Sequence, residues 1–374
     1  MDLRETPHDA AFRAEARAWL REHVPKNLAS GDTAEGFAQH LIWERQLFEA
    51  GWAVVSWPKA YGGREASIRQ WLIFEEEYYR ANGPQRVTQN GIFLLAPTLF
   101  EFGTPSQKDC ILPAMASAQT LWAQAWSEPG AGSDLAAVRS KAVRVDGGWR
   151  LYGQKTWCTR AAFCDACFGL FRSDPDSQRH QGLTYIMAPL TGDGVEVRGF
   201  GRLDGDEGFA EVFFDGLFVT DDAVIGDVGE GWRVAMATTS SERGLTLRSP
   251  GRFVAAAERL NALRVRRNSS PILDHRCLDV ALKAEAYRVF TDAAVTAMSQ
   301  GEELGSRSSL MKVFWSELDI ELHETALAIL GEDSALESEW LKGYQFSLAG
   351  PIYAGTNEIQ RKIIAERVLG LPRR

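Results

Sequence analysis

Residues 127–136 read SEPGAGSDLA, so that a proline, two glycines and two serines fall within ten positions. The strand-like run LWAQAW stands directly before them. Gly130 and Gly132 permit a close backbone approach and positive φ angles, and Ser127 and Ser133 supply hydroxyls. The free amides of such a turn can hold an anion or the polar edge of a ring.

The same composition also fits an ordinary tight loop in which Asp134 caps a helix. Neither GxGxxG nor GxxxxGK[ST] occurs in the chain, so the loop is neither a Rossmann fingerprint nor a P-loop. Composition alone therefore leaves a ligand-binding loop and a packing loop both open.

A second unusual stretch ends the following strand-like segment. Residues 154–162 read QKTWCTRAA and place Trp157 beside a thiol and between two hydroxyls, Thr156 and Thr159. An indole at a strand end is suited to cover a flat ring system, and a core tryptophan at a sheet edge is the alternative.

The periodicity of the sequence changes twice along the chain. Residues 121–228 consist of short runs rich in β-branched and aromatic residues, with the hairpin dipeptide Asp146-Gly147 between two of them. We predict a small barrel or sandwich there. Residues 1–120 and 229–374 have helical spacing, which predicts an N-terminal helical domain and a C-terminal helical bundle.

Several helix boundaries follow from local residues. Residues 67–83 read SIRQWLIFEEEYYRANG and are expected to form a helix, with Ser67 as its N-cap. Residues 231–265 show one long helical pattern, with a bend expected near Ser249-Pro250-Gly251.

Composition excludes some classes of function. The chain has 374 residues and a net charge of −9, without the clustered basic face of a nucleic-acid-binding protein. No apolar run is long enough to span a membrane, and the N-terminal segment lacks the apolar region of a secretory signal. We therefore expect a cytoplasmic protein.

The cysteine pattern suggests neither disulfides nor metal. The chain has 5 cysteines, and an odd number without a secretory signal argues against a disulfide framework. Cys164 and Cys167 have CxxC spacing, but no second ligand pair accompanies them. We expect them to be buried small side chains and predict no metal site.

Three stretches together resemble the acyl-CoA dehydrogenase family of flavoproteins. They are SEPGAGSDLA, GQKTWCT (153–159) and YAGTNEIQRKIIAERVLGLP (353–372), and they occur in the family's order. The resemblance covers nearly the whole chain and implies an α+β fold with helical, β and helical parts. It also implies non-covalently bound FAD and desaturation of an acyl-CoA to a trans-2-enoyl-CoA, an oxidation of a CH–CH bond as in fatty-acid β-oxidation.

The resemblance assigns cofactor contacts residue by residue. Ser127 would donate a hydrogen bond to the flavin, Trp157 would cover its ring, and Thr159 would lie near N5. The positions that match the family's FAD contacts are Gln124, Trp126, Ser127, Ser133, Trp157, Thr159, Thr356 and Glu358. For the last two, helix capping by Asn357 and Gln360 is a compatible second interpretation.

The catalytic base does not stand where many family members have it. The residue after the tyrosine of the YxGT stretch is Ala354, which cannot accept a proton. Some members instead carry the glutamate on the first long helix of the bundle, before an arginine, and this pattern matches Glu242-Arg243. The small residues around Glu242 leave room for a ligand, and a carboxylate desolvated by an acyl chain has a raised pKa that suits a general base.

The roles of the neighbouring groups follow from the same resemblance. Arg243 would position the loop or the flavin. The backbone amide of Ala354 would help to stabilise negative charge on the thioester oxygen.

Two departures from the family leave the assembly open. The R-x-x-F-G stretch is replaced by VRRNSSPIL, and a Gln-x-x-Gly-Gly-x-Gly stretch is reduced to Gly331. Both stretches contact FAD across subunits in the family, so a homo-oligomer and a heterotetramer with a related chain are both expected alternatives. An electron-transferring flavoprotein is the expected electron acceptor.

Two other functions compete with an active dehydrogenase. One is a non-catalytic chain that completes the FAD site of a heterotetrameric partner. The other is a flavin oxidase or monooxygenase on the same fold.

Overall fold

The computed structural model describes residues 5–243, 249–302 and 304–372, with side chains at all of them except residues 240–243. Two compact units contain these residues, and each combines segments that are distant in sequence. The α unit comprises residues 1–25, 66–84 and 243–374, and the β unit comprises residues 26–65 and 85–242.

The β unit is built on one eight-stranded sheet. Its strands are β1 (Trp122–Ala125), β2 (Lys141–Val145), β3 (Gly148–Thr159), β4 (Ala166–Arg172), β5 (Leu183–Pro189), β6 (Val195–Phe200), β7 (Phe209–Thr220) and β8 (Val224–Ile225). Their order is β6-β7-β3-β2-β4-β5-β8, and β1 pairs in parallel with β4. The predicted β-sheet part between two helical parts is confirmed.

The predicted hairpin joins β2 to β3. The two strands pair antiparallel from Lys141↔Tyr152 to Val145↔Gly148, and Gly147 has a φ of 73°. A positive φ is what the tight turns that match strand twist require. The Asp-Gly dipeptide therefore fixes the register of the strand that carries Trp157.

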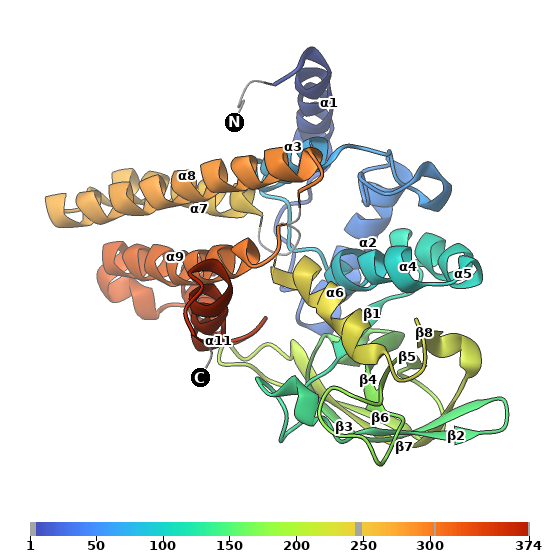
Figure 1. Ribbon diagram of the computed structural model, residues 1–374. Helices are drawn as coiled ribbons and strands as arrows, with labels where there is room; N and C mark the ends of the chain where they lie inside the picture. Colours follow the sequence, from blue (N-terminus) through green and yellow to red (C-terminus); the bar gives the residue numbers. More distant parts are fainter. Residues whose placement is uncertain (1–4, 244–248, 303, 373–374) are drawn as a thin grey trace. The chain divides into compact units, whose positions relative to one another are not determined.

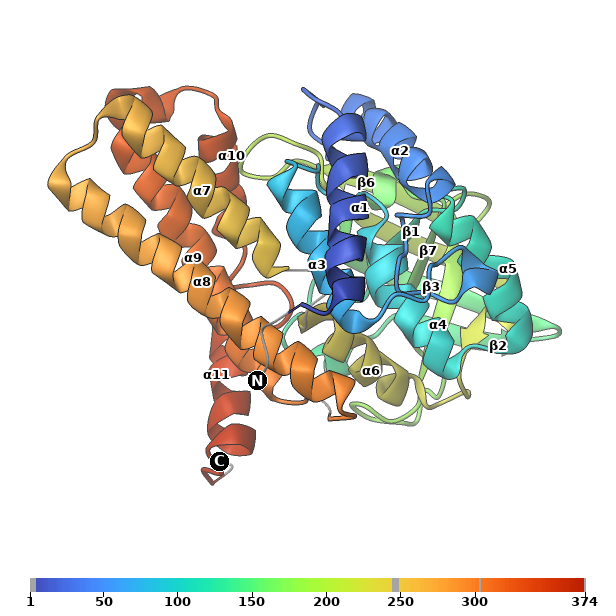
Figure 2. The ribbon, with the colours of Figure 1, turned by 90° about the horizontal axis from the view of Figure 1, so that it is seen from above.

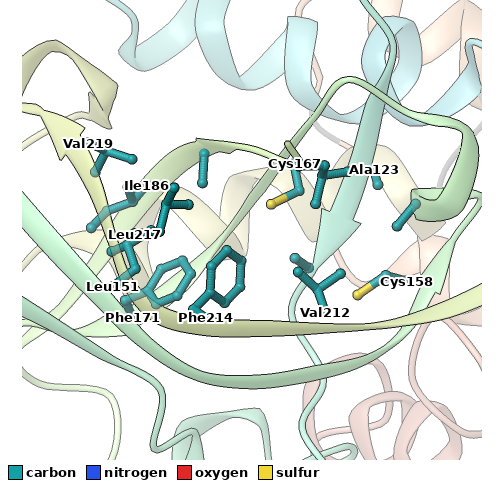
Figure 3. Packing of buried hydrophobic residues seen from close by; sticks show 14 of the residues in the cluster. Ala123, Leu151, Cys158, Cys167, Phe171, Ile186, Val212, Phe214, Leu217 and Val219 are labelled. Carbon is teal, nitrogen blue, oxygen red and sulfur yellow. The ribbon is translucent and has the colours of Figure 1, made fainter. Parts of the chain in front are cut away.

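The sheet folds over a common hydrophobic core (Figure 3). Phe171 of β4 and Phe214 of β7 pack edge-to-face with ring centroids 5.4 Å apart, although two strands lie between β4 and β7 in the sheet order. Strands so separated would be about 14 Å apart in a flat sheet. The sheet must therefore curve strongly, as the prediction of a barrel or sandwich required.

Helices accompany the sheet within the β unit (Figure 1). They are α2 (Ala34–Glu49), α4 (Ala96–Phe102), α5 (Pro105–Ala116) and α6 (Gly231–Arg243), with a π-helical turn at Asn90–Leu95. Short 3-10 turns occupy Lys59–Tyr61, Leu135–Ala137, Ala161–Phe163 and Asp221–Ala223.

The α unit is a helical assembly. Its helices are α1 (Pro7–His23), α3 (Ile68–Arg80), α7 (Pro250–Arg267), α8 (Pro271–Ser299), α9 (Arg307–Leu330), α10 (Glu339–Ser347) and α11 (Asn357–Ile363), with a 3-10 turn at Gly331–Ala335 and a π turn at Ile364–Val368. Helices α7, α8 and α9 pack against one another, and α1 packs on α3 (Figure 2). The predicted N-cap of α3 is confirmed, because Ser67 Oγ accepts a hydrogen bond from Gln70 N at 3.1 Å.

One close helix crossing requires a glycine. A Cβ on Gly251 of α7 would lie 2.7 Å from the Glu76 Cα of α3, which is too short for real side-chain contacts. The backbone of α7 can therefore lie directly on α3.

The long helix expected over residues 231–265 is instead two helices, α6 and α7. Ser249 has an extended ψ of 136° and caps α7 through its side chain, and Pro250 is the first helical residue. A proline disfavours helical geometry in the residue before it, so the expected bend is a helix start.

No helix among the described residues is long and apolar enough to cross a membrane.

Candidate functional site

The loop at residues 127–136 turns on a pair of hydrogen bonds between Glu128 and Ala131, N to O in both directions at 3.0 Å. Gly130 and Gly132 do not use the positive φ that glycine permits, because neither is among the residues with positive φ. A Cβ at either position would meet no atom of the described chain within 4 Å. Neither a positive φ nor packing within the described chain requires these glycines, and the open space beside them leaves room for the close approach of another molecule.

Asp134 does not cap the short turn that follows it. Its carboxylate instead accepts a hydrogen bond from Arg179 Nη2 at 2.9 Å. Ser133 beside it is exposed. The packing interpretation of the loop therefore loses its capping residue.

A buried ion pair ties this loop to strand β3. Lys155 is fully buried, and its Nζ donates to Glu128 Oε1 at 2.8 Å, to Leu170 O at 2.7 Å and to Trp126 O at 3.3 Å. Burial raises the pKa of Glu128. The charge of Lys155, together with the hydrogen bonds that the Glu128 carboxylate accepts, nevertheless holds that pKa below its usual range. Burial lowers the pKa of Lys155, and Glu128 partly offsets this.

The ion pair brings the two quoted stretches side by side. Thr156 N donates to Ser127 O at 2.9 Å, so the next residues of β3 lie against the start of the loop. Ser127 is half-buried. The residues that the sequence predicted to contact a cofactor on either stretch are therefore brought together in the β unit.

Trp157 stands at an irregularity of β3. The register with β7 shifts between Lys155 and Cys158, and Trp157 has a φ of 59°, which is unusual for a bulky side chain. Its indole is 61% exposed and contacts Phe200 and Phe209 edge-to-face at 5.1 and 5.5 Å. The prediction that it is a core tryptophan is excluded, and a large flat surface is left for another group to cover.

Two buried donors at the end of β1, directly before the loop, have no acceptor among the described residues. Gln124 Nε2 and Trp126 Nε1 are buried, and within the described part of the chain no hydrogen-bond partner reaches them. Leaving a buried donor unpaired costs about 1–3 kcal/mol, so each such group in a native fold needs an explanation. A bound ligand with acceptor atoms supplies one.

The end of β3 is held by contacts that sequence reasoning missed. The half-buried Thr159 accepts a hydrogen bond at its carbonyl from Asn90 Nδ2 at 3.3 Å. Arg160, with a φ of 56°, donates from Nε to Asp32 Oδ1 at 2.6 Å. The carboxyl pKa of Asp32 is lowered because, against the opposing effect of burial, Arg160 and Arg202 both stabilise its charge.

The segment before α11 carries the remaining predicted contacts, in the α unit. Thr356 is the N-cap of α11 and accepts from Ile359 N at 3.3 Å. Glu358 is exposed in the first turn, where a backbone amide and then the Thr356 hydroxyl lower its pKa. The helix is therefore capped as expected at this point, but the capping residue is Thr356 and not Asn357.

Asn357 instead accepts from the buried Lys312, with Oδ1 and Nζ 2.7 Å apart. Gln360 donates back to the carbonyl oxygens of Ala354 and Gly355.

The predicted base, Glu242, and its neighbour Arg243 lie at the C-terminal end of α6. Glu242 and Arg243 are in the last turn of α6, and their side chains are outside the described residues. The helix itself is anchored one turn earlier, where Thr238 Oγ1 lies 2.7 Å from Thr98 Oγ1 and 3.3 Å from Tyr185 Oη.

The CxxC pair is not poised for redox chemistry. Burial raises the pKa of Cys164 to about 12, and it also raises that of Cys167. Cys167 is fully buried in the sheet core, and Cys164 is half-buried beside it. Among the described residues, no group of three His, Cys, Asp or Glu side chains could hold a metal ion.

Family comparisons agree with this architecture. The N-terminal, middle and C-terminal domains of acyl-CoA dehydrogenases match residues 6–119, 123–217 and 229–369. Acyl-CoA dehydrogenase IpdE1 of Mycobacterium tuberculosis is 38% identical to the chain over 97% of both.

Solved structures agree as well. One, titled Tcur3481-Tcur3483 steroid ACAD, superposes with a TM-score of 0.90 at 26% identity, with 100% of both chains covered. Another is the ChsE4-ChsE5 complex from Mycobacterium tuberculosis, with a TM-score of 0.85 at 26% identity and the same coverage.

The family accounts for the features of the site. Its members are flavoproteins that bind FAD, whose flat ring system suits an exposed indole and whose polar edge suits unpaired donors. The expectation of FAD from the sequence is confirmed at the level of the family. The chain, from its first described helix to its last, belongs to the acyl-CoA dehydrogenase family.

Proposed function

We propose that this protein binds FAD and desaturates an acyl-CoA thioester, with Glu242 as the base that removes the α-proton. The observation that carries the proposal is the hydrogen bond from Thr156 N to Ser127 O, which joins the stretch that carries Trp157 to the stretch that carries Ser127. Two buried donors directly before Ser127 in the chain, Gln124 Nε2 and Trp126 Nε1, have no acceptor among the described residues. The membership of the chain in a family of oxidoreductases supports it.

The chain's own residues would hold the cofactor in three ways. Gln124 and Trp126 supply N–H donors that have no acceptor within the described residues, and Ser127 supplies a hydroxyl. The indole of Trp157 covers the ring and keeps water away. Ser133 and Thr159 from the β unit, and Thr356 and Glu358 from the α unit, complete the proposed contacts.

Proton abstraction is the step for which the protein supplies a side chain. Glu242 takes the α-proton, and the amide of Ala354 stabilises the charge that develops on the thioester oxygen. FAD, when bound, accepts the hydride from the β-carbon. Arg243 positions these groups and does not react.

For the substrate, we propose a bulky, ring-bearing acyl-CoA. The support is the similarity to a structure titled as a steroid acyl-CoA dehydrogenase.

A panel of thioesters tests the reaction. The purified yellow protein is mixed anaerobically with short, branched, aromatic and steroid-derived acyl-CoAs, and the flavin absorbance is followed. Bleaching that persists in air supports a dehydrogenase, and fast reoxidation with peroxide supports an oxidase. No bleaching by any thioester, in a protein that holds FAD, would contradict the proposal.

The oligomeric state of the protein is a second subject of the proposal. Both of these similar structures are named for two chains, which favours a hetero-oligomer with a related chain over a homo-oligomer. If the protein is colourless alone and gains FAD and activity only with a second chain, it is a cofactor-completing subunit. We propose an electron-transferring flavoprotein as electron acceptor, tested by its reduction in the coupled assay.

Replacing Trp157 by alanine should weaken FAD binding without unfolding the protein. The indole is mostly exposed and packs edge-to-face against Phe200 and Phe209, so its loss leaves no core cavity. Loss of an aromatic contact worth about 0.5–1.5 kcal/mol weakens FAD binding roughly 2- to 12-fold. Flavin fluorescence titration measures this.

Phe218→Ala is the matched control, because Phe218 is a 43% exposed aromatic on β7 of the same sheet. It should leave the FAD affinity unchanged. An unaltered FAD affinity in Trp157→Ala would rule out the proposed contact.

A further inference from the structure

The turn that precedes α11 has an unusual backbone. Ala354 has a φ of 55° and Gly355 a φ of 78°, so two consecutive residues are left-handed. Glycine adopts this conformation freely, but for an alanine it costs about 1–2 kcal/mol. Backbone strain of this kind persists only where the surrounding structure holds it in place.

The buried side chain of Gln360 holds this turn. Gln360 is fully buried, and its Nε2 donates to Ala354 O at 2.9 Å and to Gly355 O at 3.4 Å. Both partners are carbonyl oxygens, which accept only, so the amide orientation follows from them.

The other end of the same amide is unpaired. Gln360 Oε1 is buried, and no donor reaches it from the described part of the chain. An unpaired buried acceptor costs about 1–3 kcal/mol. An apolar side chain of similar size would avoid this cost, so the glutamine is explained only by what its Nε2 does at the turn.

The helix that carries Gln360 is itself fixed. Asn357 Oδ1 accepts from Lys312 Nζ at 2.7 Å and from Ser316 Oγ at 3.1 Å, both on α9. The hydroxyl of Thr356 caps the first turn. The helix that carries Gln360 is therefore held in place at its first turn.

The N–H group of Ala354 remains available. Among the described residues, no acceptor is recorded for it, although the carbonyl oxygens of Ala354 and Gly355 are engaged. The methyl side chain at this position has no chemistry of its own, so the backbone N–H is the group that this turn can offer to a substrate.

We propose that Gln360 is a positioning residue: it locks the backbone at Ala354 so that the amide can donate to the thioester oxygen. This inference rests on the proposed function. A donor fixed in advance stabilises developing charge far better than a mobile one, and removal of one such donor costs about 10²–10³-fold in rate. Loosening it should cost on the order of 10- to 100-fold.

The test uses Gln360→Met, which keeps the side-chain volume and removes the donor, and Gln107→Met as the matched control. Gln107 is also buried, and its Nε2 donates to two carbonyl oxygens, those of Asp222 and Val224, at 2.7 Å each. It lies in the β unit, outside every proposed contact with FAD or substrate.

Two readouts separate the inference from the proposed function. Hydrogen exchange, followed by mass spectrometry on a peptide spanning residues 350–358, should accelerate at least tenfold in Gln360→Met and not in Gln107→Met. Anaerobic flavin reduction by the best acyl-CoA of the panel should slow 10- to 100-fold in Gln360→Met alone, with FAD retained.

A third variant tests whether the donated hydrogen bond matters. In Gln360→Glu the protonated carboxyl can still donate to a carbonyl, whereas the ionised form repels it. The reduction rate relative to wild type at the same pH should therefore fall as pH rises.

The outcomes are distinct. Unchanged exchange at residues 350–358 in Gln360→Met overturns the lock, and an unchanged reduction rate overturns its role in catalysis. Failure of the wild-type protein to reduce flavin with any thioester defeats the proposed function, and the exchange experiment still decides whether Gln360 holds the turn.

Discussion

Glutamine in place of Glu242 will leave a yellow protein that no longer reduces its flavin at a useful rate. The substitution keeps the size and polarity of the side chain and removes the proton acceptor. A positioned general base contributes about 10²–10⁴-fold, so the rate of anaerobic bleaching by the best acyl-CoA should fall by that factor. Stopped-flow absorbance of the flavin measures it directly.

Glu230→Gln is the matched control for this substitution. Glu230 directly precedes the first residue of α6 and is exposed, and among the described residues its carboxylate forms one long ion pair, with Arg233, 3.9 Å from Nε to Oε2. Both variants therefore remove one carboxylate from the two ends of the same helix. If the two reduce flavin equally well, Glu242 is not the base.

The sequence predicted the elements of this fold well because their signals are local. The Asp146-Gly147 hairpin and the capped start of α3 depend on residues within a few positions of one another. The long helix predicted through Ser249 was wrong because hydrophobic periodicity continues across a helix boundary that proline geometry imposes.

The sequence singled out the two quoted stretches but not the contacts that support them, and the roles of the site residues stay predictions. The two stretches that meet at Ser127 and Thr156 were both recognised, and the bond between them confirms that they are neighbours. Gly130 and Gly132 permit positive φ but do not adopt it, whereas Trp157 does. Composition shows which residues tolerate strain, whereas tertiary contacts decide where strain is imposed.

The supporting residues were missed because their partners are distant in sequence. Gln360 was interpreted as part of a helix cap. Its side chain instead binds the carbonyl of Ala354, six residues earlier. Asn90 and Thr159 are 69 positions apart. The buried ion pair did leave a signal in the sequence. Lys155 is a lysine within a strand-like segment, and Glu128 in the other quoted stretch carries the opposite charge.

Replacing Lys155 by methionine should be the most destabilising single change in the β unit. The ammonium is fully buried and uses its donors on Glu128, Leu170 and Trp126. Removing one partner of a buried ion pair costs about 3–5 kcal/mol, because the other charge is left buried and uncompensated. Urea denaturation and loss of FAD absorbance should report it.

An exposed ion pair on the same sheet is the control. Arg198 and Glu196 are 60% and 58% exposed, with 2.7 Å between Nε and Oε1. Exposed pairs contribute about 0–1 kcal/mol. Arg198→Met should therefore unfold at nearly the wild-type urea concentration, and an equal loss in the two variants would show that burial of the Lys155 pair is unimportant.

The pH dependence separates the lost charge from lost packing. In the wild type the pKa of Glu128 is lowered from 4.5, so its contribution to stability is present above that pH and is lost as pH falls. In Lys155→Met, the Glu128 carboxyl is buried without a compensating charge, which raises its pKa. Protonation of Glu128 as pH falls then removes the buried charge and stabilises the variant. The stability gap between wild type and variant should therefore shrink between pH 7 and pH 4.

Adding Glu128→Gln removes the stranded charge, and the double variant should be more stable at pH 7 than Lys155→Met alone. A gap that is constant with pH, together with no recovery in the double variant, would mean that Lys155 contributes volume and not charge. A recovered fold that still binds FAD weakly would instead show that this ion pair also sets the spacing between Ser127 and Trp157, because it joins the two stretches on which they stand.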